Sequence, residues 1–288
     1  MQIGASIPAQ RPFLILKDND MATPESEGFI RSFARGLAVI EAMGRTGTHS
    51  VATLAAGTAL PRSVVKRALL TLCELGYAVA DEKVFRLTPK VLTLGMTYLT
   101  SLPFWGHAQR ALEDLCASVG ESCALAVFDG HEIIYVLRIP SRKIMSLRLG
   151  IGSRLPAYAT APGRLMLAYQ SEQTIASYLD HVPLKPYTPA TLGNGEALRA
   201  SLEQIRRDGY AWVDGEFDAA VCGISVPVKD ERGVVVAAIT INLLSDPASR
   251  TRAVNEILMP LRQAAQELGG MAPSFLDASI NPVRKSYR

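Results

Sequence analysis

The sequence predicts an α+β protein in which a small N-terminal module precedes a larger domain built on an antiparallel sheet. Three observations support this fold class. Residues 31–76 carry three short helical patterns in succession, and residues 77–87 alternate apolar and polar side chains around a polar turn. Residues 104–270 mix helical patterns with strand patterns joined by turns. A chain of 288 residues is long enough for two such domains.

The first helical pattern has recognisable start and stop signals. Ser32 is of a residue type that caps helix N-termini, and Gly44 is a typical stop. Phe33, Leu37 and Ile40 fall on one face of this helix, so we expect that face to be buried.

The second helix is a single short amphipathic segment. Ser50 is in position to cap it, and Val51, Leu54 and Ala55 supply its apolar face. Residues 57–60 then make a tight turn that leads into the next helix.

The third helix opens at Pro61, whose missing N–H costs nothing at a first helical position. Its apolar residues recur at helical spacing and are expected to face the core: Val65, Leu69, Leu72 and Leu75. Its polar residues near the N-terminal end fall away from that face: Arg62, Ser63, Lys66 and Arg67. Gly76 ends the helix.

A hairpin follows the third helix. Apolar residues alternate on either side of the polar turn at residues 81–83: Tyr77, Val79, Phe85 and Leu87. Three helices followed by such a hairpin are the pattern of a winged helix-turn-helix, which we assign to residues 29–88.

The charge of this segment supports binding to double-stranded DNA. Residues 29–95 contain nine Lys or Arg and four Asp or Glu, a net charge of +5, whereas the whole chain carries +3. Basic residues and a serine at the start of a short helix suit the major groove, where cations meet phosphates and first-turn side chains reach base edges. The candidate DNA-binding residues are Ser50, Arg62, Ser63, Lys66, Arg67 and Lys83. The alternative is a small helical bundle whose basic face is only solvated.

Another helical stretch starts at Pro89 and ends near Pro103. We assign residues 89–106 to a linker helix between the module and the larger domain. Such a helix serves either as a connector and dimer contact or as ordinary packing against the first helix, and both interpretations stay open.

The patterns of residues 107–270 indicate a mixed domain. Asp129-Gly130 marks a hairpin turn between two strand patterns. The later segments are a strand near 145–149, an irregular loop leading into a helix at 150–168, helices near 172–181 and 196–208, and strands within 209–217, 222–229 and 234–244. Asp246 and Pro247 cap a final helix that bends at Pro260. An antiparallel sheet with helices packed outside it is the simplest architecture.

Composition excludes several classes of protein. An apolar content of 48% supports folded cores, and no apolar run approaches the roughly 18 residues that cross a membrane. The four cysteines and four histidines lie far apart, so we expect no metal site and no cofactor. Reduced thiols, and an N-terminus without a signal pattern, indicate a cytoplasmic protein. Residues 1–28 and 271–288 are expected to be flexible tails, the second of them basic.

An enzyme is the competing class of function, because a mixed domain of this size could hold a catalytic site. The sequence contains no G-x-S-x-G, phosphate-loop or H-E-x-x-H motif, and Gly150 and Gly152 lack the third glycine of a dinucleotide site. Glu216 and Asp218 lie in a region rich in turns, where nothing places a base beside a nucleophile. We therefore expect no catalytic residues and no enzymatic activity.

Several long stretches resemble the IclR family of transcriptional regulators over about residues 29–270. The stretches that carry the resemblance are SFARGLAVIEAM, LPRSVVKRALLTLCELGYA, PKVLTLGMTYLTS, GSRLPAYATAPGRLMLA and GISVPVKDERGVVVAAITI. Within that family the chain is most similar to regulators of protocatechuate and β-ketoadipate catabolism. The resemblance implies a linker helix used in dimerisation and a GAF-like effector-binding domain. It also implies a homodimer or dimer of dimers that binds operator DNA under the control of a small organic acid.

The resemblance further implies where the effector binds. The family pocket forms between the irregular loop before a helix and the inner faces of the last strands, which points here to Ala161, Pro162, Asp214, Cys222, Gly223, Thr240 and Asn242. Backbone N–H groups at the helix start near Gly163 favour an anion, and small or hydroxyl side chains leave room and fix orientation. Each residue taken singly could instead serve turn geometry or core packing.

Two positions depart from the aromatic-acid group of the family. Those relatives have Arg-Ser where this chain has Cys222-Gly223, and Ser-Met where it has Ala161-Pro162. Loss of the arginine would remove a strong charge-assisted bond to a carboxylate. We therefore expect a different or weaker ligand, and a DNA-binding regulator without ligand control remains the alternative function.

Overall fold

A computed structural model describes the chain over residues 29–44, 49–100, 104–141 and 149–272. These residues form two compact units that divide at residues 101–102. Both predicted tails, apart from residues 271 and 272, and most of the strand expected near 145–149 lie outside the described residues. Within them, no helix is long and apolar enough to cross a membrane.

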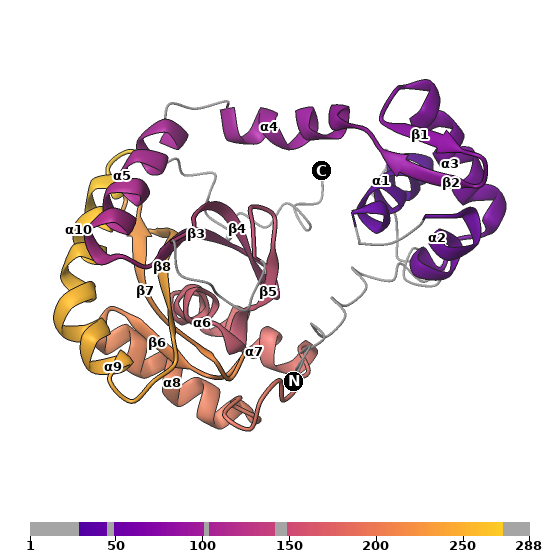
Figure 1. The fold of residues 1–288 in the computed structure, drawn as a ribbon. Helices are drawn as coiled ribbons and strands as arrows, with labels where there is room; N and C mark the ends of the chain where they lie inside the picture. The colour runs from indigo at the N-terminus through magenta and orange to yellow at the C-terminus, as the bar shows by residue number, and fades with distance from the viewer. Residues whose placement is uncertain (1–28, 45–48, 101–103, 142–148, 273–288) are drawn as a thin grey trace, which may run out of the picture. The chain divides into compact units, whose positions relative to one another are not determined.

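The first unit contains the predicted helices and wing (Figure 1). Its elements are α1 (Arg31–Met43), α2 (Val51–Thr58), α3 (Arg62–Glu74), β1 (Ala78–Asp81), β2 (Val84–Leu87), the 3-10 turn η2 (Pro89–Val91) and α4 (Leu92–Thr100). β1 and β2 pair antiparallel around a two-residue turn. This order confirms the winged helix-turn-helix.

Ser50 and the inner face of α3 have the roles that the sequence predicts. The Ser50 hydroxyl accepts a hydrogen bond from the Thr53 N–H at 3.1 Å, and the Thr53 hydroxyl accepts one from the Ser50 N–H at 2.9 Å. This reciprocal pair fixes the start of α2. Val65 and Leu69 are fully buried and Leu72 nearly so, which places α3 at the centre of the small core.

Two predicted helix boundaries in this unit are wrong. α1 begins one residue before Ser32, because the N–H groups of residues 33 and 34 both donate to the Ile30 carbonyl oxygen. Ser32 therefore lies within the first turn and does not cap it. The turn expected at residues 57–60 comes later, because α2 continues to Thr58 and the chain reverses at Ala59, whose φ is 56°.

The predicted buried face of α1 is wrong at two of its three residues, whereas Ile40 packs against the core of the module. Phe33 and Leu37 are exposed, since α1 packs on the module through Val39 and Met43. Leu75, expected in the core, follows the last turn of α3 and is exposed as well. Both errors come from apolar side chains that the fold of this unit leaves in solvent.

The segment predicted as one linker, residues 89–106, is divided between the two units. α4 ends at Thr100, and a separate helix, α5 (Phe104–Val119), belongs to the second unit. Phe104 and Trp105 are buried there, and their rings meet edge to face with centroids 5.2 Å apart. These two side chains therefore serve the core of the second unit.

After α5, the second unit continues with a strand hairpin, a group of helices, three further strands and a terminal helix. The elements are β3 (Ser122–Asp129), β4 (Glu132–Ile139), β5 (Arg154–Pro156), the 3-10 turn η3 (Ala157–Ala159), α6 (Ala161–Ala168), α7 (Glu172–His181), α8 (Gly195–Asp208), β6 (Ala211–Asp214), β7 (Val221–Lys229), β8 (Val235–Leu244), α9 (Ser249–Arg252), the wide turn η4 (Ala253–Ile257) and α10 (Leu258–Gly269).

The sheet of this unit runs in the order β5-β4-β3-β8-β7-β6, and every neighbouring pair is antiparallel. This confirms the sheet expected from the sequence. The predicted turn at Asp129-Gly130 joins β3 to β4, and Gly130 adopts a φ of 65° that favours glycine. Because β3 pairs with β8, residues far apart in the sequence meet at the middle of the sheet.

Helices cover both faces of the sheet. α5 and α10 lie against one face, while the sheet curls around α6, which is buried on all sides (Figure 1). Gly163 allows α6 to approach η3 closely, because a Cβ at this position would lie 2.3 Å from the Ala157 Cα.

The terminal helix contains an irregular turn shortly before the proline at which the sequence predicts a bend. Pro260 has no N–H to donate to the carbonyl of Glu256, and the wide π-type turn η4 lies immediately before α10. At its start, the Asp246 carboxylate accepts a hydrogen bond from the Ala248 N–H at 2.7 Å, as expected for a residue that caps this end.

Candidate DNA-binding surface and effector pocket

α3 presents its predicted basic face to solvent. Arg62, Ser63, Lys66 and Arg67 are all exposed, and their side chains take part in no ion pair or hydrogen bond within the residues that the structure describes. Their cations are therefore free to meet phosphates or base edges. Ser50, by contrast, uses its hydroxyl to cap α2, so its contribution to this surface is to position that helix.

Other basic side chains of the module are already engaged. Arg86 pairs with Asp81 on the wing at 3.3 Å. The Lys90 ammonium donates to the Leu75 carbonyl oxygen at 2.8 Å. Lys83, which lies in the turn of the wing, is exposed and takes part in no ion pair among the described residues. Among the described basic residues of the module, those without a protein partner thus lie on α3 and in the turn of the wing.

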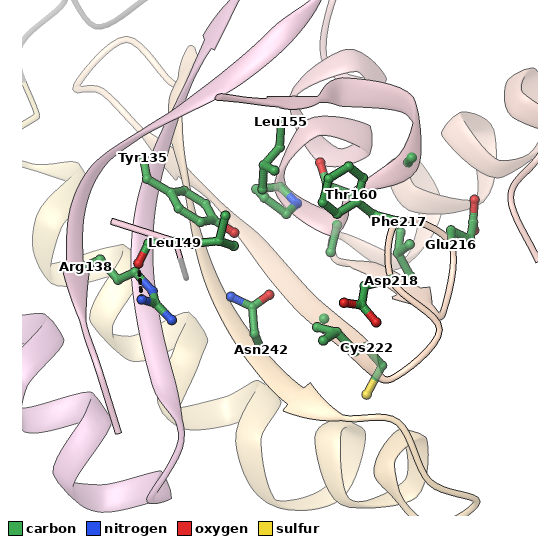
Figure 2. Close-up of a pocket in the computed structure, with 16 residues that line it drawn as sticks. Tyr135, Arg138, Leu149, Leu155, Thr160, Glu216, Phe217, Asp218, Cys222 and Asn242 are labelled. Carbon is green, nitrogen blue, oxygen red and sulfur yellow. Dashed lines mark hydrogen bonds between the residues drawn. The ribbon is translucent and has the colours of Figure 1, made fainter. Parts of the chain in front are cut away.

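The second unit encloses a small pocket between the sheet, the start of α6 and the segment that joins β6 to β7 (Figure 2). The cavity volume is about 40 Å³. Most of its lining is apolar, and its polar side chains are few: Tyr135, Arg138, Thr160, Glu216, Asp218 and Asn242. An apolar wall with a small number of placed polar groups is typical of sites for small molecules.

Five of the seven predicted effector residues lie in the wall of this pocket: Ala161, Pro162, Cys222, Gly223 and Asn242. Gly223 faces Asn242 across β7 and β8. A Cβ at Gly223 would lie 3.2 Å from the Asn242 Oδ1 and 3.3 Å from the Ala161 Cβ. The missing side chain therefore lets the sheet and the start of α6 come together at the pocket.

Asp214 and Thr240 do not line the pocket. Asp214 pairs with Cys222 across β6 and β7, on the opposite sheet face from the neighbouring pair of Val213 and Gly223. Its carboxylate accepts a hydrogen bond from a serine hydroxyl in the segment after β8. Thr240 is fully buried in the central strand, where its hydroxyl donates to a backbone carbonyl of β7 at 3.2 Å.

Cys222 is part of the pocket wall, but its thiol points away from the other lining side chains (Figure 2). The sulfur donates to the carbonyl oxygens of Leu243 and Leu244 at 3.8 and 3.6 Å. Burial, with the Asp214 carboxylate adding to it, raises the pKa of the Cys222 thiol to about 11, so the thiol is neutral at physiological pH. A side chain at this position leaves the strand on the face away from Gly223, so the cysteine does not by itself deprive the pocket of a cation.

Tyr135 and Arg138 line the pocket, although sequence reasoning missed both. Residues three apart on a regular strand point to opposite faces. In β4, however, Val136 has no partner on β3, and this bulge shifts the alternation. Tyr135 consequently pairs with Ala126 and Arg138 with Ala124, two residues of β3 that share one face. The apolar pattern of β4 carries no signal for such a shift.

A buried ion pair holds Glu216, one of the residues in the pocket wall. The Arg164 guanidinium on α6 contacts both oxygens of Glu216, at 2.8 and 2.5 Å, and the side chains are only 3% and 9% exposed. Arg164 also donates to the Tyr158 carbonyl oxygen, and Glu216 accepts from the Leu192 N–H. A buried ion pair requires that its remaining donors and acceptors also have hydrogen-bond partners. The available signal was an arginine inside the apolar stretch of residues 161–168.

Among the described residues, no group of three or more His, Cys, Asp or Glu side chains is arranged to hold a metal ion. The polar side chains that line the pocket can supply hydrogen bonds and charge. One side carries a cation at Arg138, and the other carries the carboxylates of Glu216 and Asp218.

A winged helix with an exposed basic face, attached to a separately folded domain, defines a DNA-binding transcriptional regulator. Comparison with family models agrees over most of the chain. Residues 32–82 match the IclR helix-turn-helix domain, and residues 96–269 match the model described as bacterial transcriptional regulator IclR C-terminal. The chain belongs to the IclR family, and it is a regulator rather than an enzyme.

Individual relatives agree with the family assignment. The chain is 36% identical to the Pca regulon regulatory protein of Pseudomonas putida, with 83% of each chain covered. It is 30% identical to the p-hydroxybenzoate hydroxylase transcriptional activator of Acinetobacter baylyi, over 84% of this chain and 92% of the relative. A crystal structure of an IclR homolog complexed with 4-hydroxybenzoate, from Microbacterium hydrocarbonoxydans, is 26% identical, with a TM-score of 0.70, 83% of this chain and 97% of the other covered.

Proposed function

We propose that this protein binds a specific operator through α3 and the wing, and that a small organic acid in the pocket of the second unit modulates this binding. The observation that carries the proposal is the pocket itself, which joins an apolar wall to an arginine and a tyrosine hydroxyl. Carboxylates favour such surroundings, because charge-assisted hydrogen bonds to arginine are strong. The regulated genes would serve the catabolism of aromatic or related acids, and the protein would act in the cytoplasm.

The names of the relatives support this choice of ligand class. One relative activates p-hydroxybenzoate hydroxylase, and another family member was crystallised with 4-hydroxybenzoate. The pocket of the present chain keeps a cation although position 222 is a cysteine, because Arg138 enters from β4. This arrangement favours ligand control over a regulator without an effector.

We also propose that the protein binds DNA as a homodimer or a dimer of dimers. One winged helix contacts too little DNA for a tight specific site, whereas two copies present their modules to paired half-sites. Phe33 and Leu37 lie one helical turn apart on α1, Phe29 precedes the helix, and all three are exposed. A stripe of this kind on a small module is typical of an interaction surface, and a second copy of the chain is the occupant that we propose.

The DNA assignment can be tested in two steps. Fragments that the protein binds are first selected from random duplex DNA. The affinity for the most enriched sequence is then measured by gel-shift titration at fixed salt. Alanine at Arg62, Lys66 and Arg67 together should weaken binding by several kcal/mol, since each base-reading contact contributes roughly 1–3 kcal/mol. A matched control removes three exposed arginines from the second unit: Arg199, Arg207 and Arg250. Equal affinities of the folded triple variant and the wild type would overturn the assignment of α3.

The ligand assignment needs a second measurement on the same complex. A panel of aromatic and aliphatic carboxylic acids should contain members that raise the thermal midpoint, because binding to the folded state stabilises it, and that alter operator affinity. If no acid of the panel changes the thermal midpoint or the operator affinity, the result would favour a regulator without ligand control.

A further inference from the structure

We propose that Leu70 on α3 reads the C5-methyl group of a thymine in the major groove, so that each half-site of the operator carries a thymine beneath the middle of this helix. Leu70 would then determine sequence specificity, while the neighbouring cations bind the duplex. This inference rests on the proposed operator binding and names the base that the operator must present.

The exposed face of α3 has an apolar residue at its centre. Successive helix residues advance by about 100°, so Ser63 and Leu70 lie about two turns apart on one line along the helix. Both are exposed, and Leu70 keeps 53% of its surface accessible. The other face of α3 carries Val65 and Leu69, which are fully buried in the core of the module. Leu70 therefore points away from the core, toward whatever α3 contacts.

Cations border this leucine on both sides. Around the helix axis, Lys66 lies about 40° from Leu70 in one direction and Arg67 about 60° in the other. The side chains of Lys66 and Arg67 are exposed and take part in no ion pair or hydrogen bond among the described residues. When a helix lies in a groove between two phosphate strands, cations at its edges meet the phosphates and its middle faces the bases. The charge pattern therefore directs Leu70 toward the base edges.

The carboxylate at the end of α3 limits the surface that can approach DNA. Glu74 follows Leu70 by about one turn and is exposed. Because a carboxylate is repelled by phosphates, the part of α3 that suits DNA runs from Arg62 to Leu70. Within α3, all of which the structure describes, Leu70 is the one large apolar residue that is exposed.

Thymine is the base that suits an apolar contact. In the major groove the other three bases present hydrogen-bond donors and acceptors, whereas thymine adds a methyl group. Packing Leu70 against that methyl would remove apolar surface of both groups from water. The Ser63 hydroxyl can pair with a donor or an acceptor, so it discriminates less between bases. On this face of α3, Leu70 is therefore the residue that selects one base.

Two hydrogen bonds hold the C-terminal end of α3 in place. The Lys90 ammonium donates to the Leu75 carbonyl oxygen at 2.8 Å, and the Thr88 hydroxyl donates to the Gly76 carbonyl oxygen at 2.6 Å. Both donors belong to the segment that follows the wing. A contact with a single methyl group needs a fixed side chain, because a small gap already forfeits much of the van der Waals attraction. The anchored helix therefore allows an apolar contact to contribute to specificity.

The experiment uses the full-length protein and an operator selected from random duplex DNA. Each thymine of the operator is replaced in turn by deoxyuridine, which lacks only the C5-methyl group, and affinity is measured by gel-shift titration at fixed salt. For the wild type we expect a thymine in each half-site whose replacement weakens binding by about fourfold, the effect of one buried methyl group. Leu70→Ala should bind the thymine operator about fourfold or more weakly and lose nothing further at that position, because both changes remove the same contact.

Leu75→Ala is the matched control, because Leu75 is 52% exposed but follows the last turn of α3. This variant should show the same deoxyuridine effect as the wild type. Leu70→Ala should also keep the salt dependence of binding, whereas Lys66→Ala should reduce its slope, since only the lysine neutralises a phosphate.

The outcomes separate this inference from the proposed function. A selected operator without thymine, a wild type that is insensitive to deoxyuridine, or a deoxyuridine effect that persists in Leu70→Ala would overturn the inference. In each of these cases, a loss of affinity on alanine substitution of Arg62, Lys66 and Arg67 would leave operator binding standing. Failure to select any sequence from random DNA would overturn both. Thermal melting shows that each variant is folded, and the deoxyuridine operators test the inference on the unaltered protein.

Discussion

The DNA-binding module and the second unit differ in where they place charged side chains, which are exposed on the module and buried beside the pocket of the second unit. On α3, Arg62, Lys66 and Arg67 lie in solvent, without an ion pair among the described residues. In the second unit, Arg164 and Glu216 are almost fully buried and contact each other through two hydrogen bonds. An exposed cation costs the fold little and stays available to a partner, whereas a buried one must be matched within the protein. The first arrangement suits a long polyanion, and the second stabilises a shaped cavity.

The largest effect is expected from breaking the buried pair. Arg164→Ala leaves Glu216 buried without its cation, which should lower the free energy of unfolding by about 3–5 kcal/mol. Urea unfolding followed by tryptophan fluorescence reports on the second unit, because Trp105 and Trp212 both lie in it. Arg199→Ala removes an exposed partner of an acidic side chain in the same unit and should leave the curve in place. Similar unfolding curves for Arg164→Ala and Arg199→Ala would show that the burial of an ion pair does not determine how much its loss destabilises the second unit.

The next effect concerns single cations of the DNA-binding module. Arg62→Ala should weaken operator binding by roughly 1–3 kcal/mol if the side chain reads a base edge. Arg86→Ala should have a smaller effect, because this arginine is already paired with Asp81 at 3.3 Å. Gel-shift titrations at several salt concentrations would compare the two variants. A larger loss at Arg86 than at Arg62 would move the DNA contact from α3 to the wing.

A smaller effect on effector affinity is expected from two neighbouring residues in the pocket wall, Gly223 and Cys222. Gly223→Ser brings a Cβ to within 3.2 Å of the Asn242 Oδ1, so we expect effector affinity to fall by roughly 1 kcal/mol or more. Cys222→Ser should change affinity little, because the thiol contacts carbonyl oxygens on the other side of the strand. Calorimetry with the best acid of the panel measures both. A greater loss at Cys222 would mean that its side chain does reach the ligand.

The smallest expected effect concerns the chemical reactivity of the Cys222 thiol. Because the pKa of Cys222 is raised to about 11, its thiol should resist alkylation at neutral pH and react only as the pH approaches that value. A raised pKa also means that the protonated thiol is favoured by folding, so stability should decrease as the pH rises from about 9 toward 11. Peptide mapping after timed labelling would test the first expectation. Rapid labelling of Cys222 in the folded protein at pH 7 would contradict it.

Signals from neighbouring residues in the sequence were sufficient to predict much of the structure of the first unit. Ser50 caps α2 as predicted, and Val65 and Leu69 form the core of the module, because capping and helical periodicity depend on near neighbours in the chain. The same periodicity was misleading at Phe33 and Leu37, which are apolar and exposed. An apolar stripe indicates a surface that is to be covered, but it does not say whether the same chain covers it.

By itself, the sequence determined the α+β class, the winged helix, the antiparallel sheet and the position of the pocket wall at Ala161, Pro162, Gly223 and Asn242. Only the tertiary structure decided which side chains carry the pocket's polar chemistry. Arg138 enters through a bulge in β4, and Arg164 meets Glu216 across 52 residues of chain. Strand parity and long-range pairing are set by the assembled sheet, because a one-residue shift reverses every side chain beyond it. For that reason, Asp214 and Cys222 point away from the pocket and Arg138 lines it.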